Sequence, residues 1–203
     1  MKNRKGFTLI ELLAVIVILG VLLGIAIPKV SQYITKSKKE GFVSAGKFFI
    51  DSVRNDATSE MFPLPIRNND VTIVTLDAAD LEKAQAKSSF GGKYLYNKSY
   101  VAIINVGTGV DPEYKYYFAA QDSKDYAIPL TLEQEVTTSK IVAKAKNKME
   151  VTIQSLCGTE EGYNKSYNTI SGLDSVQPTD ENGVKLNWNA TIFSKSGCNA
   201  NGE

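Results

Sequence analysis

The segment Phe7–Ile27 constrains the chain most, because it is an almost unbroken apolar run of membrane-spanning length. As an α-helix it is about 31 Å long, which matches the hydrocarbon core of a bilayer. A short basic leader, residues 1–6, precedes it, and a single acid, Glu11, interrupts it. A charged side chain near the centre of an inserted helix costs about 2.5–3.5 kcal/mol. Because an anchor alone gives no reason for this charge, we expect Glu11 to have a specific partner.

The apolar run has two interpretations: a retained transmembrane helix, or a secretory signal that is removed. The run ends Gly24-Ile-Ala-Ile-Pro28, which offers no small-x-small cleavage site and places a proline in the way. We therefore expect a retained single-pass helix. Lysines flank the run on both sides, so the positive-inside rule does not orient it. Long trailing domains translocate largely regardless of charge, and we place the C-terminal domain outside.

Gly20, Gly24 and Pro28 are spaced four residues apart and fall along one stripe of the helix. Pro28 lacks the N–H that would bond the Gly24 carbonyl, and each glycine costs about 1 kcal/mol relative to alanine in a helix interior. One interpretation is that small residues let membrane helices pack closely. The other is a helix-melting segment, which can lose helix and lengthen. Both stay open from the sequence.

The string Lys5-Gly6-Phe7-Thr8-Leu9-Ile10-Glu11, followed by Leu, Val and Ile, resembles the N-terminus of type IV prepilins and pseudopilins. The resemblance implies that a prepilin peptidase removes leader residues 1–6 by cutting between Gly6 and Phe7, and methylates the new α-amine of Phe7. It also implies that Glu11 forms a charge pair with the N-terminal amine of a neighbouring subunit.

Physical chemistry is consistent with that role. A free α-amine is largely protonated near neutral pH, so cleavage creates a cation, and Glu11 lies about 6 Å further along the helix. Each charge is costly alone in lipid and tolerable when paired. Phe7 and Glu11 also stand at i, i+4, so a pair within one chain is the alternative.

The sequence predicts an α+β, pilin-like fold. A long N-terminal helix has a membrane-spanning half, residues 7–27, and an amphipathic half, residues 28–57, in which Phe42, Phe49 and Val53 recur at helical spacing. This half is expected to pack on the antiparallel β-sheet of a globular domain, residues 58–203. Glycines in the amphipathic half predict curvature or close contacts there; they are Gly41 and Gly46.

Within the domain, β-branched and aromatic runs predict strands separated by turn residues. The predicted strands are 71–76, 93–96, 100–106, 114–120, 126–130, 149–156 and 184–193. A short helix is expected over 77–87, residues 132–148 are ambiguous with a short helix at their start, and the Gly-, Asn-, Ser- and Thr-rich stretch 158–183 predicts exposed loop.

Cys157 and Cys198 predict one disulfide if the domain is exported, closing a C-terminal loop. Loop-closure arithmetic gives such a bond about 4 kcal/mol of stabilisation at most. Two unrelated buried thiols are the alternative.

Composition and motifs exclude several functional classes. The formal net charge is +1, with 23 basic and 22 acidic residues, so charge indicates no nucleic-acid partner. No histidine is present, which rules out a Ser-His-Asp or Cys-His arrangement. We therefore expect no catalytic residues, no metal site and no cofactor. Acidic loop residues lack the D-x-D-x-D-G spacing of a calcium loop, so a solvated surface is the better account.

The resemblance implies a structural subunit of a type IV pilus. Such a subunit waits in the cytoplasmic membrane and then moves into a surface filament. Its expected partners are copies of itself, a prepilin peptidase and the membrane-bound pilus assembly machinery, with minor pilins as further candidates. The alternatives are a pseudopilin of a secretion or competence system and a membrane-anchored enzyme or binding module. Twitching motility, adhesion, aggregation or DNA uptake would follow from the family and from no residue of this chain.

Overall fold

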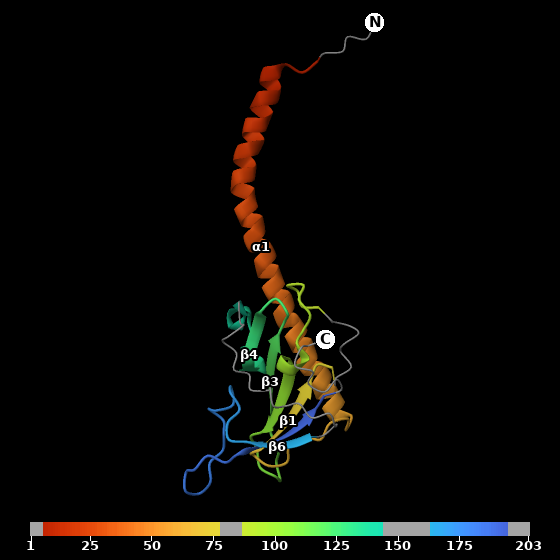
Figure 1. Cartoon of the computed structure of the whole chain (residues 1–203), viewed down its shortest axis with the longest axis vertical. Helices are drawn as coiled ribbons and strands as arrows, with labels where there is room; N and C mark the ends of the chain where they lie inside the picture. The colour runs from red at the N-terminus through yellow and green to blue at the C-terminus, as the bar shows by residue number, and fades with distance from the viewer. Residues whose placement is uncertain (1–5, 78–86, 144–162, 195–203) are drawn as a thin grey trace. The chain divides into compact units, whose positions relative to one another are not determined.

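The computed structural model describes residues 6–77, 87–143 and 163–194 (Figure 1). The chain divides into two compact units, Met1–Lys38 and Lys39–Glu203. Both units contain part of one helix, α1 (Leu9–Thr58), which is continuous over 50 residues. This agrees with the predicted helix, and Pro28 lies inside it without ending it. Among the helices of the described residues, α1 alone is long and apolar enough to cross a membrane.

The C-terminal end of α1 is a Schellman motif. The Met61 N–H donates to the Asp56 carbonyl (3.0 Å) and the Glu60 N–H to the Ala57 carbonyl (3.1 Å). Glu60 has a φ of 61°, the left-handed conformation that this motif requires. The helix thus ends just before a stretch that contains Pro63 and Pro65.

The second unit contains one seven-stranded sheet, in the order β5-β4-β3-β2-β1-β7-β6. The strands are β1 (Asp70–Thr75), β2 (Tyr100–Asn105), β3 (Tyr114–Gln121), β4 (Tyr126–Leu132), β5 (Val142–Ala143), β6 (Tyr163–Tyr167) and β7 (Trp188–Phe193). Short 3-10 turns are η2 (Tyr96–Lys98), η3 (Glu133–Glu135) and η4 (Thr138–Lys140). Strands β1 to β5 form an antiparallel meander, of which β1 to β4 were predicted as strands and β5 was not.

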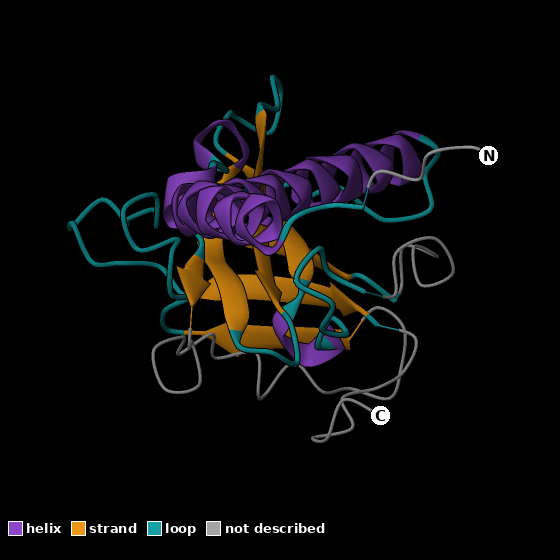
Figure 2. Ribbon diagram, turned by 90° about the horizontal axis from the view of Figure 1, so that it is seen from above, coloured by secondary structure: helices purple, strands orange, loops and turns teal. Residues whose placement is uncertain are grey.

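One face of the sheet packs against the part of α1 that belongs to the second unit (Figure 2). Phe42, Phe49 and Val53 are buried there, as their spacing predicts. The Phe49 ring lies 5.6 Å from that of Tyr94 and 6.1 Å from that of Phe118, between ring centroids. Helix and sheet thus share a core rich in aromatic rings, which confirms the α+β architecture.

Gly46 is the point of closest approach between α1 and the sheet. A Cβ built on it would lie 2.6 Å from Cε1 of Phe118, closer than van der Waals contact allows. The absence of a side chain lets the ring lie against the helix backbone, which confirms the close contact predicted at this glycine.

The opposite face of the sheet is also covered. Ile170 and Leu173, which follow β6, pack in a second buried cluster with Tyr100 and Trp188. Every residue of β2 is consequently buried, so its sequence is nearly apolar throughout instead of alternating.

Three strand-level expectations differ from the structure. The sheet is mixed and not wholly antiparallel, because β7 runs parallel to β1. The strand predicted at 93–96 is wrong: Lys93 and Tyr94 form isolated bridges, and η2 follows. The predicted loop 158–183 is wrong for residues 163–167, which form β6. Residues 168–183 contain no named strand or helix, although Ile170 and Leu173 are buried.

The physical reasons are specific. Residue periodicity predicts a strand but not the direction of its partner, so the parallel pair was not visible. The Tyr94 ring packs in the aromatic core against α1, and its centroid lies 5.6 Å from that of the Phe42 ring. The strand predicted over 149–156, most of the short helix over 77–87, and the pairing of Cys157 with Cys198 lie outside the described residues.

Candidate functional site

The candidate site is the N-terminal start of α1. Gly6, Phe7 and Thr8 precede the helix and have no regular secondary structure. The Phe7 side chain is 92% exposed, and no atom lies within 4 Å of a Cβ built on Gly6. The Gly6–Phe7 bond, where cleavage is expected, therefore lies in an open, non-helical stretch next to the first helical turn.

Glu11 forms a capping box with Thr8. Its carboxylate Oε2 accepts a hydrogen bond from the Thr8 N–H (2.8 Å) and another from the Thr8 hydroxyl (2.8 Å). In return the Thr8 hydroxyl oxygen accepts from the Glu11 N–H (3.3 Å). This reciprocal arrangement satisfies two backbone donors that a helix start leaves without partners.

Sequence reasoning missed Thr8, although a signal was present. Threonine followed three residues later by glutamate, just before an apolar run, is the pattern of a capping box. The described hydrogen bonds of the Glu11 carboxylate all end on Oε2. Oε1 is therefore placed to accept from another donor, at a helix end where the macrodipole favours negative charge.

Gly20, Gly24 and Pro28 lie within unbroken helix. Nothing comes within 4 Å of a Cβ built on Gly20 or Gly24, so neither glycine is needed for a contact within this chain. Their role in helix packing or helix melting stays a prediction.

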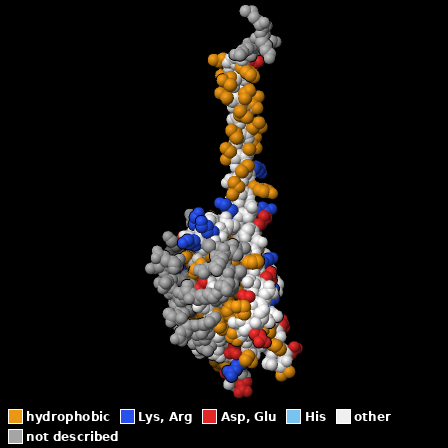
Figure 3. Space-filling model, turned by 90° about the vertical axis from the view of Figure 1, so that its right-hand side faces the viewer, with side chains coloured by type: hydrophobic (Ala, Val, Ile, Leu, Met, Phe, Trp, Pro, Cys, Tyr) orange, Lys and Arg blue, Asp and Glu red, His pale blue; other side chains and the backbone are white. Residues whose placement is uncertain are grey.

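The described large apolar side chains of the first unit are all exposed, and Figure 3 shows those on one face of α1. Leu22 and Ile25, for example, are 57% and 66% exposed. A helix that is apolar all round is normally buried in a membrane or in the core of an assembly. No described residue of the chain covers these side chains.

Buried polar groups in the second unit have structural roles. The Asp122 carboxylate accepts hydrogen bonds from the Ser88 hydroxyl and from the N–H groups of Lys124 and Tyr126 (both 2.9 Å). It thereby fastens the 87–94 loop to the turn between β3 and β4. Within the described residues, no group of three or more His, Cys, Asp or Glu could hold a metal ion.

Arg54 links α1 to the sheet. Its guanidinium bonds Glu133, pairs with Asp51 (2.6 Å) and lies 4.6 Å from the centroid of the Tyr116 ring. The hydrogen bond to Glu133 raises the pKa of Arg54 above its ordinary value. Burial raises the pKa of Tyr94 and of Tyr100. These groups stabilise the domain and line no site.

Comparisons with known proteins agree with the motif. Residues 1–27 match the family model described as the prokaryotic N-terminal methylation motif. A type IV major alpha-pilin and fimbrial protein Q, both of Moraxella bovis, are each 47% identical over 55 residues, which is 26% of this chain and 35% of the relative. The chain thus spans about a third of the length of these curated relatives. No solved structure matches the chain significantly.

The matched residues coincide with the site and leave most of the sheet domain unmatched. They include the open Gly6–Phe7 junction, the Thr8–Glu11 capping box and the exposed apolar helix. The chain therefore carries the N-terminal methylation motif of prokaryotic pilins over residues 1–27, and about a quarter of it is similar to part of a type IV major alpha-pilin and of a fimbrial protein.

Proposed function

We propose that the chain is a structural subunit of a type IV pilus, held in the cytoplasmic membrane and then polymerised through α1. The observation that carries the proposal is the exposure of apolar side chains all around the first unit, where residues 9–27 contain one charged group, Glu11. Lipid covers this surface before assembly, and neighbouring copies of the same helix cover it afterwards.

Processing supplies the second charge. Cleavage between Gly6 and Phe7 by a prepilin peptidase leaves a protonated amine on Phe7, which is then methylated. In the structure Glu11 Oε2 already has two donors in its own chain, and Oε1 is placed for another. This supports a pair with the amine of the next subunit, because the capping box need not be broken to form it. A charge pair of this kind fixes the axial offset between neighbouring subunits.

The remaining parts of the proposal concern the domain. It lies outside the cell membrane, with Cys157 and Cys198 joined in a disulfide. Gly20, Gly24 and Pro28 either pack closely against neighbouring helices or lose helix on assembly. The assembly machinery and minor pilins are partners by family resemblance.

Mixed assembly tests the direction of the charge pair. Glu11→Gln keeps the shape of the side chain and removes the charge. Expressed alone, we expect it to be processed but at least tenfold depleted in material sheared from the cell surface. Co-expressed with the wild type, it should enter filaments in part, because its own amine can still meet the Glu11 of a wild-type neighbour.

Two results would contradict this account. If Glu11→Gln alone formed normal filaments, the charge of Glu11 would not be required for assembly. Complete exclusion of the variant from mixed filaments would favour a pair within one chain. Assembly of the wild type in only trace amounts would instead favour a pseudopilin.

A further inference from the structure

The second unit has a lysine-bearing end, formed by segments that are distant in sequence. The 87–94 loop lies against the start of the domain part of α1: a Cβ on Gly41 would lie 3.1 Å from that of Ser89, and the Phe42 and Phe90 rings are 5.8 Å apart. The β3–β4 turn joins them, since the Lys124 ammonium donates to the Phe90 carbonyl (3.3 Å). The lysines brought to this end are Lys39, Lys87, Lys93 and Lys124.

These lysines are available to an outside partner. Lys87, Lys93 and Lys124 are exposed and Lys39 is half-buried. Within the described part of the chain, none of the four forms an ion pair. Two partly or fully exposed acids, Glu40 and Asp125, lie at the same end, while Asp122 is buried beneath it with its own donors. Among the described residues, lysine therefore dominates the exposed charge of this end.

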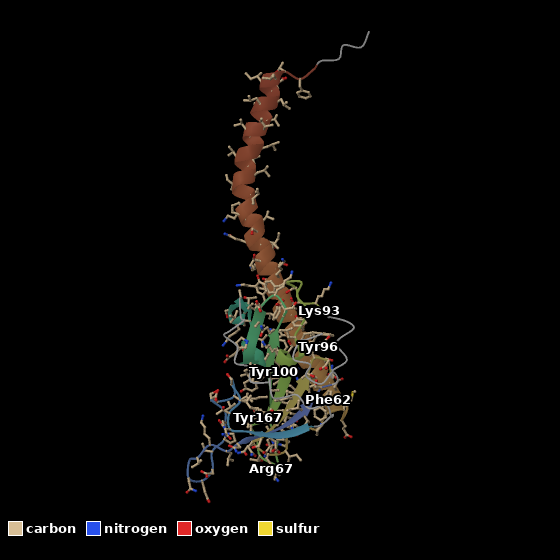
Figure 4. All side chains as sticks on the ribbon, viewed as in Figure 1. Phe62, Arg67, Lys93, Tyr96, Tyr100 and Tyr167 are labelled. Atoms are coloured by element: carbon tan, nitrogen blue, oxygen red, sulfur yellow. The ribbon has the colours of Figure 1, made fainter. Side chains whose placement is uncertain are left out.

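The opposite end of the domain has the opposite charge. Figure 4 shows Lys93 and Arg67 at opposite ends of the domain. Acidic residues gather in the far loops, with fewer basic ones among them; they are Asp111, Glu113, Asp174, Asp180 and Glu181. On the face of the domain that Figure 3 shows, Lys and Arg gather mainly toward one end and Asp and Glu mostly toward the other.

Chain connectivity places the lysine-bearing end close to the bilayer. Lys39 follows the apolar run by twelve residues, a distance of about 18 Å as helix. The intervening residues 28–38 contain three lysines, Lys29, Lys36 and Lys38, and no acid. Among the described residues, the exposed charge of the domain is thus mainly basic at the end that contains Lys39 and mainly acidic at the opposite end.

We propose that the lysine-bearing end docks on the headgroups of anionic phospholipids while the subunit waits in the membrane. Each basic side chain near an anionic surface is attracted to it, and the attraction is screened by salt. The contact holds the domain against the bilayer with its acidic loops turned away, and extraction into a filament releases it. This inference rests on the membrane-held stage of the proposed function.

Lysine labelling of the full-length chain in vesicles tests the proposal. An amine-reactive reagent is applied to protein in phosphatidylcholine vesicles and in vesicles that also contain phosphatidylglycerol, and modification is measured by mass spectrometry. We expect labelling of Lys87, Lys93 and Lys124 to slow about fivefold with the anionic lipid, the factor for one basic group at such a surface. High salt should restore it.

The same chain carries matched controls. Lys115 is the second residue of β3, about 20 Å of strand from the end that leads to Lys124, and Lys185 lies in a far loop. Their labelling should not depend on lipid charge. A second measurement uses hydrogen exchange of the 87–94 loop, which anionic lipid should slow in the wild type and in Lys115→Gln/Lys185→Gln, but not in Lys87→Gln/Lys93→Gln/Lys124→Gln.

Each other outcome has a distinct meaning. Equal labelling in both lipids, with the protein floating with the vesicles, overturns the docking proposal and leaves the membrane anchor intact. Failure to float overturns both. Protection that follows protein density instead of lipid charge would assign the lysines to a contact between copies. Protection by soluble glycerophosphate without anionic lipid would assign them to free phosphate.

Discussion

The two parts of α1 have the same secondary structure and opposite surroundings. In the first unit, large apolar side chains such as Leu22 are exposed, and a Cβ on Gly24 would touch nothing. In the second unit, Phe49 is 1% exposed, and a Cβ on Gly46 would strike Phe118. One half of the helix therefore has its packing partner within the chain, and no described residue covers the other half. Under the proposed function, lipid or other subunits cover that half.

This difference teaches which properties belong to the monomer. Substitutions in the second unit should change the free energy of unfolding of the domain. Substitutions in the first unit should leave that free energy unchanged and act on assembly. Trp188, the only tryptophan of the chain, is fully buried in the domain and provides a fluorescence signal for its unfolding.

The largest expected difference comes from truncating one large apolar side chain in each half. Phe49→Ala should lower the free energy of unfolding by about 3–5 kcal/mol, because a buried ring is lost and a cavity remains. Leu22→Ala should leave it unchanged and reduce filament yield instead. Denaturant titration of the full chain in detergent, followed by Trp188 fluorescence, measures the first effect. Equal unfolding midpoints for the two variants would contradict the division.

Matched glycine substitutions should give a smaller difference. Gly46→Ala should destabilise the domain by about 1–3 kcal/mol, because the new methyl group overpacks against the buried Phe118 ring. Gly24→Ala has open space and should not change domain stability. The same titration applies. An unchanged midpoint for Gly46→Ala would mean that the helix moves away from the ring at little cost.

The capping box should give a local effect. Thr8→Val removes the hydroxyl that bonds Glu11 and should cost about 1 kcal/mol of stability in the first helical turn. Thr35→Val is the control, since that exposed hydroxyl bonds only the Ser31 carbonyl of its own helix among the described contacts. Hydrogen exchange of the first turn in micelles should accelerate for Thr8→Val only. Similar exchange of the first turn in both variants would mean that the Thr8–Glu11 capping box does not stabilise the helix start.

Alkaline pH should lower the stability of the second unit, whereas a change of pH near neutrality should not. Burial raises the pKa of Tyr100, so the folded domain keeps this phenol neutral at a pH where the unfolded chain, near pH 10, already ionises it. The stabilisation is complete below about pH 10 and is lost as the pH rises further. Tyr100→Phe should move alkaline unfolding to higher pH, whereas Tyr33→Phe, at an exposed position of the first unit, should not. Circular dichroism against pH measures this.

Much of the helix could be predicted from sequence, because its signals are local. The apolar run, the spacing of Phe42, Phe49 and Val53, and the close contact at Gly46 all follow from helical periodicity. Strands β2, β3 and β4 were also predictable from local signals, because each is a short run of β-branched and aromatic residues between turn residues.

What could not be predicted depends on pairing between distant segments. The parallel contact of β1 with β7 joins residues more than a hundred positions apart, and the second core depends on Ile170 and Leu173 folding over the sheet. At the site, the roles expected of Gly6, Phe7 and Glu11 could be inferred from their motif. The capping role of Thr8 could have been predicted from its spacing to Glu11, which is that of a capping box. Only the charge of Glu11 was considered from the sequence, and a partner for it was therefore expected outside the first helical turn.

Mass spectrometry of material sheared from the cell surface tests the central claim most directly. The account predicts an abundant chain that begins at a methylated Phe7 and is two hydrogens lighter than its reduced form, as one disulfide requires. Assembled protein that retains residues 1–6 would contradict the claim that the helix enters a filament only after the Gly6–Phe7 bond is cut.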